Sequence, residues 1–176
     1  MRSPVPALFG AVAFASAALS SAQTPTKPPA PATPPPSHHH AEVAERGDHV
    51  MGFDHTKTTH HFTLTETGGV IAVSANDASD TESRDAIRRH LRHEAEMLGE
   101  GNFHDPMTIH DRVPPGVPVL KRDHAKIRWT YADTERGGEI VITAPNAEDR
   151  KAVHEFLRFQ IEDHGTGDPL EVSKKP

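Results

Sequence analysis

Histidine is the residue type with the most chemical capacity in this chain, which has 176 residues, 14 histidines and no cysteine. Without thiolate, a set of imidazole nitrogens and carboxylate oxygens suits zinc or cupric ions. The densest grouping is His90-x-x-His93-Glu94, whose spacings of three and four residues place side chains side by side on a helix. The sequence therefore predicts histidine chemistry, with divalent metal binding as its leading form.

A second histidine source is an alternating segment in which His60 shares one face with Phe62 and Leu64, while His61 points to the opposite side. We expect His60 to approach His90 beneath the helices. The zinc protease patterns His-Glu-x-x-His and His-x-x-Glu-His are both absent, so no peptidase is inferred. The candidate metal ligands are His60, His90, His93, Glu94, His61 and His154.

Other histidines have weaker signals. Neighbouring acid and imidazole groups on predicted loops form a further set, namely Asp54-His55, His104-Asp105 and His110-Asp111. His164 ends a predicted helix, where a protonated imidazole interacts favourably with the helix dipole. Together the histidines also make the net charge sensitive to acidification.

The elements that position these residues occur twice in the sequence. Gly68-Gly69 and Gly137-Gly138 are 69 residues apart, and each pair follows one alternating segment and precedes another. Helical patterns over residues 86–92 and 152–158 then follow with an offset of 66. We interpret this as a duplicated strand-strand-helix unit, with each glycine pair as a hairpin turn. Ser79 and Glu82 predict a capping box for the first helix, and Gly165 ends the second.

Two hairpins and two one-sided helices bury their apolar faces most simply in two layers. The predicted fold class is α+β: a tandem strand-strand-helix repeat forming a four-stranded antiparallel sheet with two helices on one face. The other sheet face, with Thr63, Ala72 and Val141, is partly apolar, and we expect a homodimer through this open face.

The repeat also provides an internal comparison, because a position that the fold requires should recur in both copies. The histidines do not recur: His90 aligns with Phe156, His93 with Phe159, His154 with Arg88, and His164 with Leu98. Imidazole is therefore not required by the scaffold at these positions.

Residues 1–22 have the order of a secretory signal peptide: a basic start, an apolar stretch over residues 7–19 and small residues before a cleavage point after Ala22. Residues 23–48 read as a disordered Pro/His-rich tether that includes the run His38, His39 and His40. The α+β domain is expected over 49–170 and a disordered tail over 171–176. The sequence thus predicts a periplasmic or secreted protein with no membrane span after signal removal.

Charge and motifs exclude several classes. The formal charge is −6, which gives no basic excess for binding nucleic acid. Neither a Gly-x-Ser-x-Gly elbow nor a phosphate-binding Gly-x-x-x-x-Gly-Lys loop occurs, so no catalytic residues are assigned.

The strings MGFDHTKTTHHF (51–62) and FLRFQIEDHGTGDP (156–169) resemble a family of small exported bacterial proteins of unestablished function. The resemblance covers roughly residues 48–170. Some sequences of this type are labelled aspartate carbamoyltransferase, but the Ser-Thr-Arg-Thr motif of that enzyme is absent and the chain is too short for its two domains.

Three functions remain open from sequence. The first is an exported domain that binds zinc or copper through histidines. The second is a protein-interaction or structural module without metal, and the third is a small hydrolase or transferase with a His or acid general base.

Overall fold

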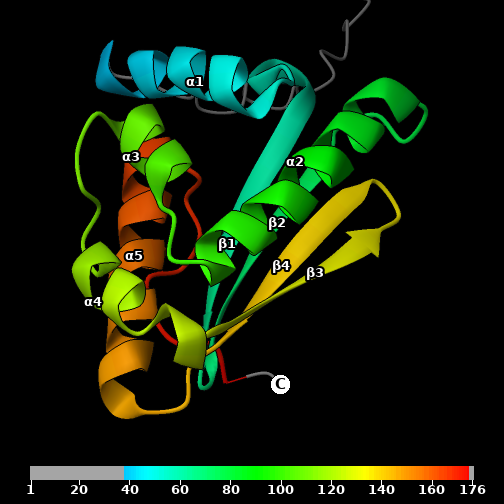
Figure 1. Ribbon diagram of the computed structural model, residues 1–176. Helices are drawn as coiled ribbons and strands as arrows, with labels where there is room; N and C mark the ends of the chain where they lie inside the picture. The colour runs from blue at the N-terminus through cyan, green and yellow to red at the C-terminus, as the bar shows by residue number, and fades with distance from the viewer. Residues whose placement is uncertain (1–37, 175–176) are drawn as a thin grey trace, which may run out of the picture. The chain divides into compact units, whose positions relative to one another are not determined.

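The computed structural model describes residues 38–174. The predicted signal peptide, residues 23–37 of the predicted tether and residues 175–176 lie outside the described residues. In chain order the elements are α1 (His38–Met51), the 3₁₀-helix η1 (His55–Lys57), β1 (Thr58–Thr65), β2 (Gly68–Ala75), α2 (Thr81–Gly99), α3 (His104–His110), α4 (Val117–Arg122), the 3₁₀-helix η2 (His124–Lys126), β3 (Arg128–Thr134), β4 (Gly137–Thr143) and α5 (Ala147–His164) (Figure 1).

The four strands form one antiparallel sheet in the order β1-β2-β4-β3, which confirms the predicted α+β fold. Its two halves are related by a pseudo-twofold axis between β2 and β4. Gly69 pairs with Ile142 and Val73 with Gly138, so each pair becomes the other when 69 is added to one residue number and subtracted from the other. The duplication seen in the sequence is therefore also present in the strand register.

The predicted position of the hairpin turns is wrong by two residues. The turns are Glu66-Thr67 and Glu135-Arg136, and the glycine pairs are the first residues of β2 and β4. Glycine is required there because the two central strands approach closely. A Cβ atom on Gly68 would lie 2.2 Å from the Ile142 carbonyl oxygen, and one on Gly137 would lie 2.1 Å from that of Val73.

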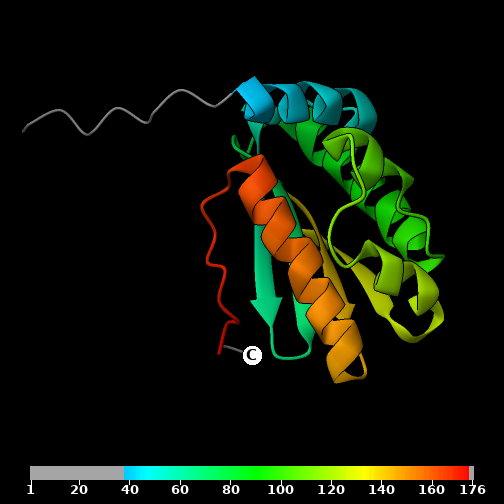
Figure 2. The ribbon, with the colours of Figure 1, turned by 90° about the vertical axis from the view of Figure 1, so that its left-hand side faces the viewer.

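Both long helices cover the same face of the sheet, and each packs mainly on the strands of the other copy. Helix α2 contacts β3 and β4, whereas α5 contacts β1 as well as β2 (Figures 1 and 2). The core between them is built from alternate strand residues and the apolar stripes of the helices, including Phe62, Leu64, Ile71, Val73, Ile87, Leu91, Leu98, Ile140, Ile142, Val153, Phe156 and Leu157. This exchange of helices ties the two copies into one core.

The helix caps differ in detail from the sequence prediction. Helix α2 is capped by Asp80, whose side chain accepts a hydrogen bond from the Ser83 amide, rather than by a Ser79–Glu82 box. Ser79 instead donates to Asp77 in the preceding turn. The C-cap of α5 is Gly165 in the left-handed conformation, as predicted.

Two segments beyond the repeat are more ordered than the sequence suggested. Helix α1 begins at His38, inside the segment expected to be a tether, and is held by the buried Val43 and by Arg46 Nε, which donates to the Ile109 carbonyl at 2.6 Å. In the predicted tail, the Ser173 amide donates to the Leu64 carbonyl at 2.8 Å and forms a parallel bridge beside β1. The predicted boundaries missed both because neither segment has a regular apolar period.

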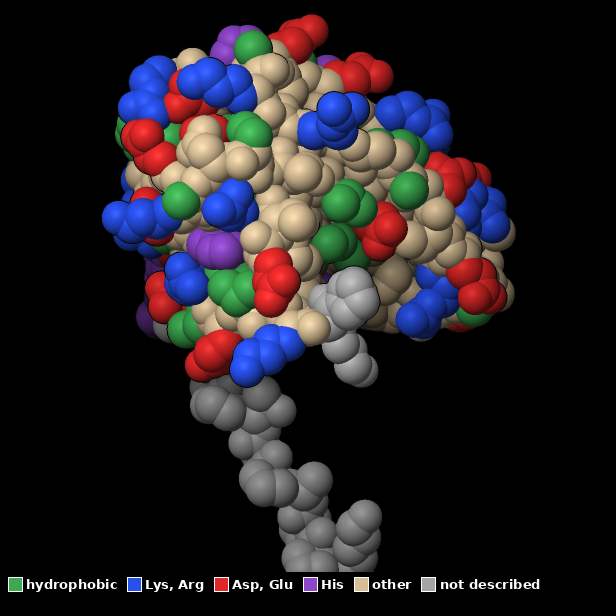
Figure 3. Space-filling model, turned by 90° about the horizontal axis from the view of Figure 1, so that it is seen from below, with side chains coloured by type: hydrophobic (Ala, Val, Ile, Leu, Met, Phe, Trp, Pro, Cys, Tyr) green, Lys and Arg blue, Asp and Glu red, His purple; other side chains and the backbone are tan. Residues whose placement is uncertain are grey.

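The surface of the described part carries charges of both signs. Figure 3 shows basic and acidic side chains interspersed over the side seen from below. Ion pairs join some of them, such as Arg122 with Glu148 and Lys126 with Asp123, each at 2.8 Å. Among residues 38–174, no helix has the length and apolar character needed to cross a membrane.

Candidate functional site

A buried cavity of about 60 Å³ lies between the helix-covered face of the sheet and helices α2, α3 and α5. One water molecule needs roughly 10–15 Å³ measured in this way, so the cavity holds several waters or an ion with part of its hydration shell. Much of its wall is apolar. The polar side chains that line it are His60, His90, Glu94, Asp105, His110, Gln160 and His164.

His60 reaches the cavity because it shares the inward face of β1 with Phe62, as the alternation predicts. Its ring stacks on those of Phe53 and His164, with centroid distances of 6.0 and 5.7 Å. Burial, helped by the nearby His90, lowers the pKa of His60 to about 4. This imidazole is therefore neutral at pH 7.

His164, at the end of α5, does not have the role expected from its position. Its ring packs inward against His60 and lies edge-on to His110 at 4.9 Å. Burial lowers the pKa of His164 to about 3, so the ring is neutral and is not a protonated partner of the helix dipole. The expectation failed because it used only the position in the helix and ignored the buried residue, Leu98, at the equivalent place in α2.

His90 and Glu94 lie one turn apart on α2 and both line the cavity. The His90 ring contacts Phe53 edge-on at 5.8 Å, and burial lowers the pKa of this imidazole. Glu94 is 8% exposed, and its Oε2 atom has no hydrogen-bond partner. Burial, together with the charge of Asp105, raises the pKa of Glu94 to about 8, so its carboxyl group carries a proton at neutral pH.

Gln160 of α5 is the counterpart of Glu94, 66 residues earlier on α2, and is also buried at the cavity. Its Oε1 atom lies 2.8 Å from His110 Nε2, and its Nε2 atom has no partner. Whichever way the amide is turned, one of its two polar atoms remains unpaired. The duplication thus directs an acid from one copy and an amide from the other at the same space.

His110 is oriented by a buried carboxylate. Its Nδ1 atom donates to Asp163 Oδ2 at 2.5 Å, and Asp163 also accepts from His39 at 2.7 Å and from Arg112 at 2.5 Å. Burial alone would raise the pKa of Asp163, but these hydrogen bonds bring it to about 2. The ionised carboxylate therefore fastens α1 and the segment after α3 to the end of α5.

The cavity combines several polar groups that the protein leaves without partners. Within residues 38–174 the ring nitrogens of His60, His90 and His164 form no hydrogen bond, and the Glu94 and Gln160 atoms described above are also unpaired. Buried polar groups are normally paired, because each unpaired one costs about 1–3 kcal/mol. Five such groups around one cavity indicate that a polar occupant belongs there.

The remaining predicted ligands lie elsewhere. His61 points away from the helices and binds Asp168 at 2.8 Å, and His93 is exposed. His154 Nε2 donates to the Thr65 carbonyl, which matches the bond from Arg88, its counterpart in the first copy, to the Thr134 carbonyl. His154 therefore has a scaffold role, whereas His60, His90 and Glu94 are brought together. Sequence reasoning did not assign Asp105, His110, Gln160 or His164 to this site.

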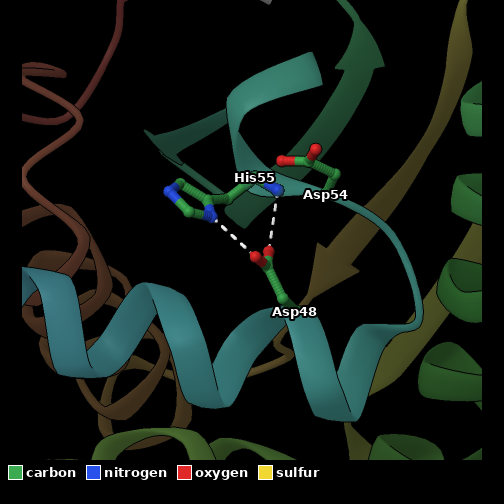
Figure 4. Close-up of side chains that lie close together, drawn as sticks. All are labelled: Asp48, Asp54 and His55. Atoms are coloured by element: carbon green, nitrogen blue, oxygen red, sulfur yellow. Dashed lines mark hydrogen bonds and ion pairs between the residues drawn. The ribbon is translucent and has the colours of Figure 1, made fainter.

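A second group of acid and histidine side chains lies on the surface, where α1 meets η1 (Figure 4). One ligand atom from each of Asp48, Asp54 and His55 lies within 4.8 Å of the others, and no other such group of three occurs in residues 38–174. Asp48 accepts from the His55 amide at 2.7 Å and from its Nδ1 atom at 2.8 Å, and Asp54 caps η1 through Thr56. These bonds give the group a structural role in joining α1 to β1.

The buried side chains do not meet this distance criterion. No three ligand atoms of His60, His90, Glu94, His110 and His164 lie within 4.8 Å of one another. His60 and His164 stack with an interplanar angle of 10° instead of pointing at one centre. A metal ion in this cavity would therefore need rotation of these side chains.

The comparisons with known proteins add no assignment. No family model, no curated protein and no solved structure matches this chain.

Proposed function

We propose that this protein binds one divalent transition metal ion, zinc or copper(II), in the buried cavity, with His60, His90 and Glu94 as ligands and His164 as a fourth. The observation that supports this is the set of unpaired imidazole, carboxyl and amide groups around one enclosed space. Three or four nitrogen and oxygen ligands satisfy the preferences of both ions.

The protonation states favour a cation. The pKa values of His60 and His164 lie well below 7, so a metal does not compete with protons for these imidazoles. Glu94 holds a proton at neutral pH, and an ion would displace it and gain a carboxylate ligand. His110, whose Nδ1 atom is fixed by Asp163, resembles the carboxylate-oriented histidines common near metal sites.

The other functions have less support. A general base requires an accessible imidazole, but His110 Nε2 is occupied by Gln160 and the other cavity imidazoles are buried. The predicted signal peptide leads us to place the metal-binding domain in the periplasm or outside the cell, where imidazole ligands without cysteine are insensitive to thiol oxidation.

The paired neighbours on β1 and α2 allow a matched test. In protein purified without an affinity tag, His60→Ala and His90→Ala should lower zinc or copper affinity by more than about 100-fold, because each removes a ligand. His61→Ala and His93→Ala, which change the next residue on β1 and an exposed residue one turn along α2, should leave it unchanged. Isothermal titration and elemental analysis measure the effect, with circular dichroism as the folding control.

Two results would contradict the proposal. One is an unchanged metal content in both His60→Ala and His90→Ala. The other is loss of binding in His55→Ala with full binding in His60→Ala, which would assign the metal to the surface group instead.

We also propose that two copies associate through the open sheet face. Within residues 38–174 no helix covers this face, and its centre carries the small or uncharged side chains Val70, Ala72 and Val141, the last 37% exposed. The predicted dimer should dissociate in Thr63→Glu but persist in Thr81→Glu, which changes an exposed residue at the start of α2. Sedimentation velocity measures this, and a monomeric wild type would contradict it.

A further inference from the structure

A second chamber, of about 230 Å³, lies between α1, the start of β1 and the end of α5. Its wall includes His40 and Ala44 from α1, His55 from η1, and Thr59 and Thr166. Three further residues, Met51, His60 and His164, line both this chamber and the buried cavity. The two spaces are therefore separated by the side chains of these three residues.

The His60–His164 stack forms the polar part of this partition. The two rings are nearly parallel at 5.7 Å, and neither has a hydrogen bond to hold its orientation within the described residues. Stacked rings of this kind are held mainly by packing, so rotation of either about its χ angles breaks no hydrogen bond. The chamber side of each ring and the cavity side are then alternative positions for a ligand on the same imidazole.

The outer part of the chamber carries two more imidazoles. His40 packs beside Gly165, next to His164, since a Cβ atom on Gly165 would lie 3.2 Å from the His40 ring. His55 is exposed, and its Nδ1 atom is fixed by Asp48 at 2.8 Å. His40 belongs to the histidine run at the start of α1, to which the buried site gives no role.

We infer that this chamber is the route by which a hydrated divalent metal ion enters the buried site, with His40 and His55 as its first ligands and the His60–His164 stack as the inner gate. This inference rests on the proposed function. A graded series of imidazoles lets an ion exchange water for nitrogen ligands stepwise, which avoids complete dehydration at any point.

An entry residue and a final ligand have different kinetic signatures. His40→Ala should lower the association and dissociation rates of zinc together, by about fivefold or more, because it slows passage in both directions and leaves affinity and stoichiometry unchanged. His38→Ala, an exposed neighbour on the same helix and outside the chamber, should have wild-type rates. Stopped-flow exchange of zinc with a fluorescent chelator measures both rates.

A blocking variant provides a second test that removes no imidazole. Ala44→Phe fills the chamber and should also slow association, whereas Ala41→Phe, at an exposed position of α1, should not. Wild-type association rates in both His40→Ala and Ala44→Phe would overturn the entry route while leaving the buried site intact. Failure of the wild type to bind zinc or copper would overturn the proposed function and the entry route together.

Discussion

Acidification from pH 7 to pH 4 is expected to destabilise the metal-free domain by on the order of 5 kcal/mol. His60 and His164 have pKa values of about 4 and 3 in the folded protein and about 6.5 when unfolded. The unfolded chain therefore binds more protons below pH 6.5, and the stability that is complete above this pH is lost as the pH falls toward 3. This loss is comparable with the entire stability of many domains, so acid unfolding near pH 4 should follow.

The duplication provides the variant that tests this effect. His164→Leu installs the residue found at the equivalent position of the first copy, Leu98, which is fully buried. Urea unfolding at pH 7 and pH 4.5 should show about half of the wild-type acid destabilisation in this variant, whereas the exposed His93→Leu should match the wild type. An unchanged acid dependence in His164→Leu would show that His164 does not titrate as a buried group.

The second large effect has the opposite sign with pH. Glu94→Gln should stabilise the metal-free domain at pH 8 by on the order of 3 kcal/mol and have little effect at pH 4.5. Burial raises the pKa of Glu94 from 4.5 to about 8, so the folded protein binds more protons than the unfolded chain between these values. The stability of the wild type is therefore lost as the pH rises through this window, and the neutral amide avoids that loss.

Helix α2 also supplies the control. Glu96→Gln changes an exposed carboxylate two residues away and should have the same small effect at both pH values. Urea unfolding of each variant at pH 4.5 and pH 8 measures the difference. Equal stabilisation of Glu94→Gln at the two pH values would contradict a protonated buried carboxyl. In the presence of zinc the same substitution should weaken binding, because it removes the proposed anionic ligand.

The repeat allowed the fold to be predicted because a duplication constrains topology. Two copies of one hairpin and helix need a common core, and the fixed offset of 69 residues between the glycine pairs implied a symmetric sheet. The turns were misplaced because a Gly-Gly pair has two explanations, a positive φ angle or close backbone contact. The contact with Ile142 and Val73 that decides between them lies in the other copy.

The site was only partly predictable for a related reason. Alternation along β1 and the apolar stripe of α2 correctly directed His60 and His90 inward, since both signals are local. His110 comes from the irregular connection between the copies, whose path no periodicity specifies. Gln160 gave no signal of its own, and only its alignment with Glu94 could have indicated that it faces the cavity.

The central claim is that a metal ion binds in the buried cavity, and anomalous X-ray diffraction at the zinc absorption edge tests it most directly. Crystals of the tag-free protein grown with one equivalent of zinc should give an anomalous peak between His60, His90 and Glu94, with these side chains rotated toward it. A peak found only beside Asp48 and His55, or no peak within the domain, would contradict the account.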